Sequence, residues 1–410
     1  MSRQSWEVFR IRDFRLMLTA RVFSSLALPM LIVAVGWTVY DLTRDPLYLG
    51  YVGLTLFLPQ ILLTLPAGHI ADLVDRRIIL LICFSLLALA AALLASFVLF
   101  EVREVAPIFA VLLLYACANS FLRPASTSLV PMLVPKEHLP SAVAWNSSTW
   151  TMAGTIGPAL GWLLYGFGAQ IVFCTSAVLL LGSVAILSRL SPRPPLAQGD
   201  SHWLERLFAG VKFVWRRPIL LGAISLDLFA VLLGGATALL PVFARDILAV
   251  GPWGLGLLRS APAVGALSCG LFLAHFPLKR RAGVTMFLCV AGFGAGTIVF
   301  GLSRFLPLSL LALVSMGACD MVSVYVRQTL VQLNTPDEMR GRVSAVTMIF
   351  IGASNELGEF ESGVTASWFG TVPAVVIGGI GTLLVVVIWS LAFRSLRRVD
   401  RLVLPEQAAP

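Results

Sequence analysis

The stretch IILLICFSLLALAAALLASFVLF fills residues 78–100 and carries no charged side chain over 23 positions. A bilayer core of about 30 Å is crossed by about 20 helical residues, so this stretch is long enough to span one. Hydrocarbon offers a free peptide group no hydrogen-bond partner, so a continuous apolar run predicts a helix and not an alternating barrel strand.

The composition of the whole chain agrees with a membrane protein. Of the 410 residues, 58% are hydrophobic and 12% are charged, whereas soluble domains are about 25% charged. These values exclude disordered, collagen-like and disulfide-stapled chains. The longest polar stretch, 191–217, is too short for a folded catalytic domain. The six cysteines and four histidines lack metal-ligand spacing, so we expect no metal site.

Eleven other stretches are long and apolar enough to cross a bilayer. We therefore predict an all-α membrane protein with twelve transmembrane helices. The predicted spans are 14–41, 46–71, 78–100, 105–128, 139–165, 169–190, 218–244, 251–276, 283–302, 306–331, 342–367 and 371–393.

The spans divide into two sets of six. We predict an N-terminal six-helix bundle over 1–190, a cytoplasmic linker over 191–217 and a C-terminal six-helix bundle over 218–410. Within the linker, residues 201–215 have an amphipathic pattern that favours an interfacial helix bridging the halves.

Short matches relate the two halves and predict that the bundles are pseudo-symmetric. Pro46-Leu-Tyr-Leu-Gly50 opens span 2, and Pro252-Trp-Gly-Leu-Gly256 opens its counterpart, span 8. Arg76-Arg77 and Arg280-Arg281 follow the same two spans. Their common order and spacing indicate parallel repeats.

Lysine and arginine set the predicted orientation. With both termini in the cytoplasm, the cytoplasmic segments together with the adjoining span ends (Arg15, Arg189 and Arg342) hold 22 of the 30 basic residues, and the outer loops hold four. This asymmetry follows the positive-inside rule and predicts a multi-pass protein of the plasma membrane, in bacteria the inner membrane.

A polar motif follows span 2, in the sequence Gly68-His-Ile-Ala-Asp72-Leu-Val-Asp-Arg76-Arg77. It resembles the G-x-x-x-D-x-x-x-R-R loop of the major facilitator superfamily, except that Asp75 replaces a glycine. The arrangement of two six-helix repeats also resembles this superfamily, over nearly the whole chain. The resemblance implies that this loop latches the two halves on the cytoplasmic side. A carboxylate at a helix end can pair with arginine and with a helix N-terminus. The alternative is a plain basic anchor loop.

A second motif lies in span 5, where Gly154-Thr-Ile-Gly157-Pro158-Ala-Leu-Gly161 is followed by Trp162. It resembles the antiporter signature of the exporters in this superfamily, although Trp162 stands at its last glycine. The resemblance implies export. The alternative is an ordinary seam of small residues that lets two helices approach.

Further stretches resemble the branch that contains enterobactin exporters and macrolide-efflux proteins. They are Asp13-Phe-Arg-Leu before span 1, the segment 36–46 at its end, and Arg123-Pro-Ala with Leu129-Val-Pro and Pro135-Lys-Glu.

Ionisable residues inside the spans are functional candidates, because burying a charge is costly. Glu356 and Glu359 lie three apart near the middle of span 11 and share a helical face. Neighbouring carboxylates in a low dielectric favour a state in which one holds a proton, as a proton carrier requires. We predict proton coupling at Glu356 and Glu359, with Asp320 and Asp227 as further candidates. The alternative is pairing with arginines across the bundle.

We predict different roles for the arginines that lie within the spans. Arg21 could face the substrate cavity, as could Asn355, because the resembled fold places span 1 on the cavity and span 11 near it. The alternative for Arg21 and for Arg259 is extension to the nearer interface. Arg123 and Arg327 lie near the inner ends of spans 4 and 10, where we predict gate or anchor roles.

We expect a secondary active exporter of amphiphilic small molecules that works by proton antiport. No ATP-binding loop occurs, so the proton gradient is the expected energy source and no cofactor is expected. The partners would be a small-molecule substrate and membrane lipids, without nucleic acid, and the protein would be a monomer. The alternatives are an importer or lysolipid flippase of the same fold, or a non-transporting scaffold or sensor. No assembled catalytic set is present, so we do not expect an enzyme.

Overall fold

The protein is described by a computed structural model, which covers residues 7–191, 203–276, 278 and 280–400. Within these residues the chain is helical and has no strand. Its first half contains η1 (Val8–Arg10), α2 (Arg12–Thr43), α3 (Pro46–Leu73), α4 (Arg76–Leu99), α5 (Ala106–Leu133), η2 (Lys136–His138), α6 (Leu139–Tyr165) and α7 (Ala169–Leu187). Its second half contains α8 (Trp203–Trp215), α9 (Pro218–Leu233), η3 (Ala236–Leu239), α10 (Leu240–Val242), η4 (Phe243–Ile247), α11 (Gly251–His275), α12 (Ala282–Leu302), α13 (Leu306–Leu333), α14 (Asp337–Phe369), α15 (Thr371–Ala392) and α16 (Arg394–Arg397).

The twelve predicted spans correspond to twelve helical segments. Ten of the described segments are long and apolar enough to cross a membrane. The two others are α6 and α14, and α14 is polar because it carries three glutamates in its outer half. The predicted all-α membrane fold is confirmed.

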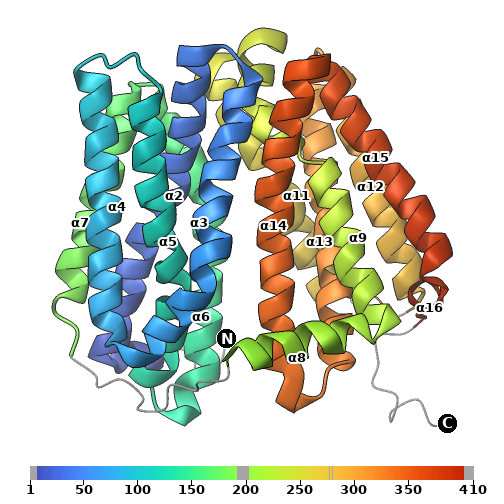
Figure 1. Cartoon of the computed structure of the whole chain (residues 1–410), viewed down its shortest axis with the longest axis horizontal. Coiled ribbons are helices and arrows are strands. Elements are labelled where there is room, and N and C mark those ends of the chain that lie inside the picture. Colours follow the sequence, from blue (N-terminus) through green and yellow to red (C-terminus); the bar gives the residue numbers. More distant parts are fainter. Residues whose placement is uncertain (1–6, 192–202, 277, 279, 401–410) are drawn as a thin grey trace. The chain divides into compact units, whose positions relative to one another are not determined.

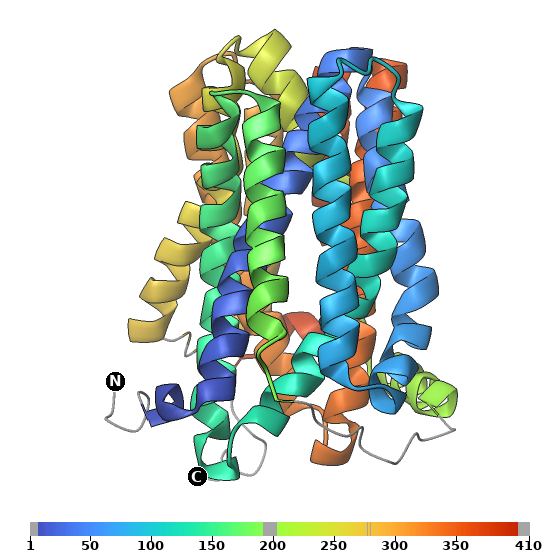
Figure 2. The ribbon, with the colours of Figure 1, turned by 90° about the vertical axis from the view of Figure 1, so that its left-hand side faces the viewer.

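Contacts divide the chain into two compact units. The first, the N-terminal unit, comprises Met1–Arg44 and Thr55–Ser201. The second, the C-terminal unit, comprises Asp45–Leu54 and His202–Pro410. In the first unit, α2 packs against α6 and α7, and α4 packs against α5 and α7 (Figures 1 and 2). In the second unit, α9 packs against α14 and α15, and α12 packs against α13 and α15. Equivalent helices therefore pair in the same way, which is the internal repeat that the sequence predicts.

The first turns of α3 belong to the second unit because two glycines fit them against α14. A Cβ on Gly50 would lie 3.0 Å from the Phe360 carbonyl oxygen, and a Cβ on Gly53 would lie 2.8 Å from the Glu359 Cβ. The backbones can approach this closely because both residues are glycine.

Span 7 differs from its prediction as one continuous helix over 218–244. Helix α9 ends at Leu233, and the chain continues through the 3-10 turn η3, the short α10 and the π-helical turn η4. Gly234 and Gly235 occupy the break, and a Cβ on Gly235 would lie 2.8 Å from the Gly358 carbonyl oxygen. Close approach of α14 and the helix-breaking tendency of paired glycines explain the interruption.

The predicted amphipathic segment forms α8. In its described part, Val214 is buried with Leu220 and Ile224 of α9 and with Val343 and Val346 of α14. Whether this helix bridges the two halves stays a prediction.

Helices α11 and α13 meet through glycines, which gives the first testable prediction. A Cβ on Gly317 would overlap the Pro262 carbonyl, whereas a Cβ on Gly341 of α14 would meet no atom within 4 Å. We expect Gly317→Ala to lower the free energy of unfolding by about 1–3 kcal/mol, because the added methyl group forces two backbones apart. Gly341→Ala should be neutral or stabilising by up to about 1 kcal/mol, because alanine favours a helix.

Thermal unfolding of both purified variants, followed by tryptophan fluorescence, measures the difference. A Gly317→Ala protein that unfolds at the wild-type temperature would show that the α11–α13 contact is looser than the structure describes.

Candidate functional site

The interior of the C-terminal unit contains an ion pair between Asp227 of α9 and Arg327 of α13. Only 8% of Asp227 and 3% of Arg327 are exposed. Asp227 lies nine residues into α9, and Arg327 lies six residues before the end of α13. These positions correspond to about 14 and 9 Å from the same side of the bundle, so the two side chains can meet. The pair compensates two charges that hydrocarbon would strongly disfavour.

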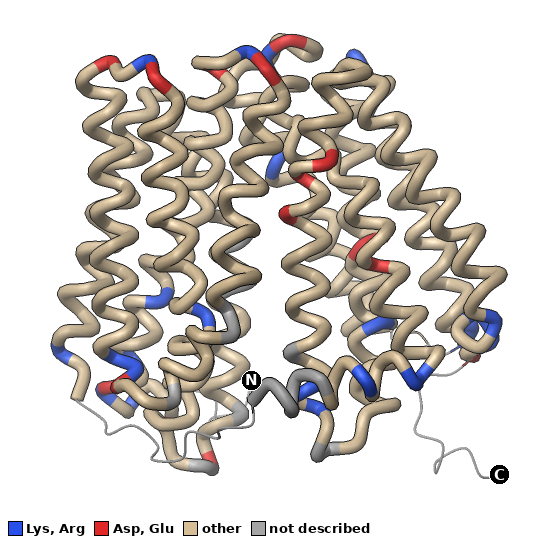
Figure 3. Tube along the Cα trace, viewed as in Figure 1, with Lys and Arg blue, Asp and Glu red and all other residues tan. Residues whose placement is uncertain are grey.

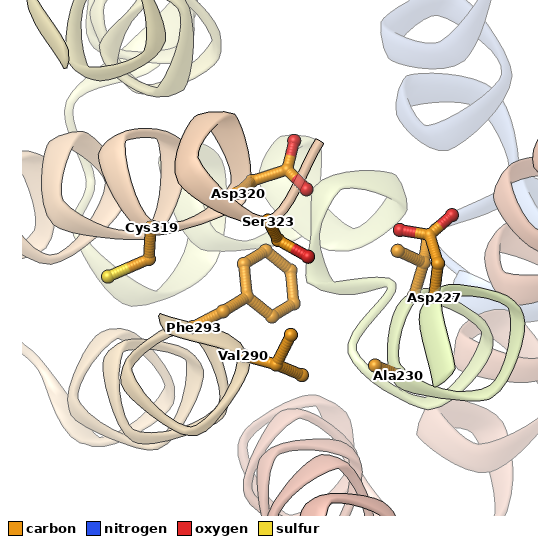
Figure 4. Close-up of a pocket in the computed structure, with 8 residues that line it drawn as sticks. Asp227, Ala230, Val290, Phe293, Cys319, Asp320 and Ser323 are labelled. Carbon is orange, nitrogen blue, oxygen red and sulfur yellow. The ribbon is translucent and has the colours of Figure 1, made fainter. Parts of the chain in front are cut away.

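Asp320 lies two turns from Arg327 on the same face of α13. It lines a small cavity with room for about one water molecule. In Figure 4, Asp320 and Ser323 lie above the Phe293 ring from α12, and Asp227 lies across from them on α9. The cavity is lined by Asp227, Ala230, Val231, Val290, Phe293, Cys319, Asp320 and Ser323.

The Asp320 carboxylate has no hydrogen bond or ion pair within the part of the chain that the structure describes. It interacts electrostatically with both Asp227 and Arg327. Two carboxylates therefore share the field of one guanidinium group. If all three groups are ionised, the cluster has a net charge of −1.

A second charged group in this unit joins α11 and α14. Arg259 interacts electrostatically with Glu359. The Glu359 side chain also lies against Gly53, because a Cβ on that glycine would lie 3.4 Å from the Glu359 Oε2 atom. Of the alternatives open from the sequence, this placement favours pairing of Arg259 across the bundle over extension to the interface.

The other α14 residues are placed differently. A Cβ on Gly53 would lie 3.0 Å from the Glu356 carbonyl oxygen, so the Glu356 backbone also faces the first turns of α3. Asn355 is exposed. Glu361, towards the outer end, accepts a hydrogen bond of 2.7 Å from Thr365 Oγ1.

The N-terminal unit contains an arginine site of its own. The Arg21 Nη1 atom of α2 donates a hydrogen bond to the Ser126 hydroxyl oxygen of α5. Arg21 also interacts electrostatically with Arg123, which is exposed on α5. Arg21 thus extends towards α5 within its bundle. Arg123 and Arg327, predicted to play similar roles, differ because Arg327 is buried in an ion pair.

The motif between α3 and α4 fastens parts of the N-terminal unit to one another. Asp75 begins α4 by accepting a 2.9 Å hydrogen bond from the Arg77 backbone N–H. The Arg77 side chain donates to the carbonyl oxygens of Leu187 (3.2 Å) and Ser188 (2.5 Å) at the end of α7. Arg76 is buried and its Nη1 atom lies 3.2 Å from the Met132 sulfur.

These contacts complement the α7 C-terminus, whose last carbonyls have no helical partner. The two arginines of the motif therefore anchor the start of α4 to α5 and α7. A Cβ on Gly68 would meet no atom within 4 Å, and the Asp72 side chain lies outside the described residues. The latch role stays a prediction.

The motif in α6 packs closely on α2. A Cβ on Gly157 would lie 3.2 Å from the Leu26 carbonyl oxygen, and a Cβ on Gly161 would lie 3.0 Å from the Met30 Cα. Pro158 lies inside the helix between them, whereas the surroundings of Gly154 are outside the described residues. Trp162, which replaces the usual glycine, packs its ring 5.5 Å from that of Trp37. The small-residue seam is therefore present.

Comparison with known proteins identifies the family. Residues 3–407 match the family described as transmembrane secretion effector. The chain belongs to this family, within the major facilitator superfamily. An enterobactin exporter of Shigella boydii serotype 18 is 26% identical over 423 residues, and the match covers 97% of each chain.

Solved structures share the fold. A bacterial homologue of the human lysosomal transporter Spinster, inward-facing and occupied, has a TM-score of 0.76 at 14% identity and covers 94% of this chain and 97% of its own. A D-xylose–proton symporter has a TM-score of 0.70 at 10% identity, covering 92% and 96%. Family and fold make this protein a multi-pass secondary transporter of small molecules and not an enzyme.

Three features of this family member are not predicted from its sequence. The spacing along one helix relates Asp320 to Arg327, but the Asp227–Arg327 pair is not predicted, although the similar depth of the two residues is a usable signal. Ser126 is not predicted as the partner of Arg21. Asp75 departs from the family pattern in the sequence, whereas in the structure it caps α4.

The ion pair gives a testable order of stabilities. Arg327→Gln leaves Asp227 and Asp320 without their shared cation and should lower the free energy of unfolding by about 3–5 kcal/mol. Asp227→Asn should cost less, because Asp320 remains available to Arg327. The Asp227→Asn, Asp320→Asn double variant should be severely destabilised, because it leaves the guanidinium group with neither carboxylate.

Thermal unfolding in detergent across a range of pH tests this order. The Arg327→Gln defect should shrink as pH falls, because protonation removes the uncompensated negative charges. Equal destabilisation by Asp227→Asn and by the double variant would mean that Asp320 cannot replace Asp227.

Proposed function

We propose that this transporter exports amphiphilic small molecules, drug-like or siderophore-like, by proton antiport across the bacterial inner membrane. The family description and the enterobactin exporters among its relatives support export. The excess of basic residues in the predicted cytoplasmic segments supports an inner-membrane protein with both termini in the cytoplasm. The proton gradient is the energy source in this proposal, and no cofactor takes part.

The observation that carries the proton-coupling proposal is the Asp320 carboxylate, which borders the cavity while Arg327 is paired with Asp227. An uncompensated charge inside a lipid-embedded bundle is costly, so binding a proton there relieves a penalty of several kcal/mol. Because Arg327 already neutralises Asp227, the proton is best placed on Asp320. The cavity beside the carboxylate has room for about one water molecule.

Asp320 is favoured over the acids of α14 whose partners the structure describes, while Glu356, the first candidate from the sequence, stays a proposed carrier. Glu359 interacts with Arg259, and Glu361 accepts a hydrogen bond from Thr365. Protonating Asp320 leaves Arg327 held by Asp227 alone, and releasing the proton sets both carboxylates competing for it. The protonated and deprotonated states of Asp320 therefore differ in the electrostatic forces between α9 and α13. Alternating access requires that two states of the protein differ in this way.

The proposed substrate class rests on the exporter relatives and on the apolar character of this interior. Around Asp320 the lining is largely apolar, with Val231, Val290 and Phe293. Sites with few polar groups among apolar side chains suit amphiphilic ligands. Arg21 and Asn355 remain proposed substrate contacts, and we expect the transporter to act as a monomer without a nucleic-acid partner.

Transport by inside-out membrane vesicles tests the proposal. With an acidic lumen, the wild-type protein should accumulate a compound from a panel of siderophore-like and drug-like amphiphiles, and a protonophore should abolish this accumulation. Asp320→Asn should lose the gradient-driven accumulation but keep energy-independent exchange, because the neutral side chain mimics the protonated state.

Glu361→Gln is the matched control, since it neutralises an acid in the same unit that is away from the cavity. It should retain the response to the pH gradient. Gradient-driven accumulation by Asp320→Asn at the wild-type level would remove Asp320 as the proton carrier. Accumulation that ignores the pH gradient in the wild-type protein would refute proton antiport itself.

A further inference from the structure

Seven exposed arginines lie at the predicted cytoplasmic end of the C-terminal unit, at the ends of three different spans. Two follow α8 and precede α9, two precede α12, and three belong to α16 and its end. They are Arg216, Arg217, Arg280, Arg281, Arg394, Arg397 and Arg398.

The fold brings these segments together. Helix α16 packs against both α9 and α12. The Gly283 backbone N–H donates a 2.9 Å hydrogen bond to the Val399 carbonyl oxygen, which ties the chain after α16 to the start of α12. One turn into α9, Gly222 lies against the Phe393 ring that precedes α16. Figure 3 shows basic residues at α16 and at the end of α8.

Of the residues that the structure describes at this end, Asp400 is the acid that contacts the cluster. Among the described residues, none of the seven guanidinium groups makes an ion pair. The nearby Asp400 uses its Oδ1 atom to accept a 2.9 Å hydrogen bond from the Arg281 backbone N–H. Arg217 lies over the Phe213 ring at 5.2 Å. Such a cluster attracts anions, and the planar guanidinium fork suits phosphate oxygens.

The position of these arginines relative to the span ends indicates which kind of anion they bind. Helix α9 begins at Pro218, α12 begins at Ala282 and α15 ends at Ala392, so the arginines lie within about 9 Å of a span end. This is the level of lipid headgroups. Trp215, 71% exposed, adjoins Arg216, and tryptophan prefers this level.

Apolar surface continues into the membrane below the arginines. Leu288 of α12 and Ile388 and Leu391 of α15 are each more than half exposed. Because α12 and α15 pack side by side, these side chains can lie along an acyl chain. A soluble anion would use the arginines but not this surface.

We propose that this cluster is a binding site for an anionic glycerophospholipid. The arginines of α16 and those before α9 and α12 hold the phosphate group, and the acyl chains lie along α12 and α15. The bound lipid joins the end of the C-terminal unit to three of its spans. Basic pockets between spans on the cytoplasmic side suit such headgroups, because the inner surface of the membrane is negative.

The test compares two variants that remove equal charge. Arg394→Gln, Arg397→Gln and Arg398→Gln are combined in one variant, and Arg10→Gln, Arg12→Gln and Arg15→Gln are combined in the control. The control arginines are exposed in η1 (Arg10) and in the first turn of α2 (Arg12 and Arg15), at the predicted cytoplasmic end of that helix. Native mass spectrometry of detergent-purified protein titrated with phosphatidylglycerol measures the affinity, and phosphatidylcholine is the neutral reference.

We expect the α16 variant to lose about 100-fold in affinity for the tightest phosphatidylglycerol site, since each arginine near an anionic surface contributes about five-fold. The control variant should bind as the wild-type protein does. Gel filtration verifies folding, and an Arg216→Gln, Arg217→Gln variant, with α16 intact, should show a smaller loss.

Unchanged affinity in the α16 variant, or an equal loss in the control, would overturn the proposal. Glycerol phosphate distinguishes a lipid site from a soluble-anion site. If it competes as well as the lipid at equal concentration, the apolar surface takes no part and the lipid assignment is wrong.

Discussion

A peptide group in hydrocarbon has nothing to bond except another peptide group, and this constraint governs the whole molecule. It makes each span a helix and removes most of the hydrophobic driving force between spans, since lipid chains are as apolar as leucine. Helices must then be held by close backbone approach. Gly265 and Gly317 serve this purpose between α11 and α13, as Gly157 and Gly161 do between α2 and α6.

The same medium makes every interior charge consequential. In the C-terminal unit, Asp227 is paired with Arg327, and Glu359 interacts with Arg259. In the N-terminal unit, the Arg21 guanidinium group binds the Ser126 hydroxyl. Asp320 stands apart because Arg327, the guanidinium group that interacts with it, is paired with Asp227. A residue that the medium penalises and the fold leaves uncompensated is where a mobile proton is most useful.

The sequence predicts the spans well because hydropathy over about 20 residues is a property of the chain alone. Eleven of the predicted spans agree with their helices to within a few residues, as at 139–165 for α6. Span 7 is placed correctly, but its helix is not continuous as predicted, because hydropathy does not register a backbone break such as the one at Gly234 and Gly235. The site is less predictable. A sequence shows which residues share a helical face, as Asp320 and Arg327 do, but not which neighbour that face meets. The Asp227–Arg327 pair joins residues 100 positions apart and depends on how α9 and α13 are rotated about their axes, which packing across the bundle sets.

The interruption after Leu233 makes the two repeats mechanically unequal. Helix α2 is a rod of 32 residues, whereas its counterpart α9 stops after 16. Asp227 therefore lies on a short helix, six residues before the break at its end. If α9 tilts by about 10° about this break, which lies about 9 Å from Asp227 along the helix, the carboxylate moves by about 1.5 Å. A shift of this size is enough to break a hydrogen-bonded pair.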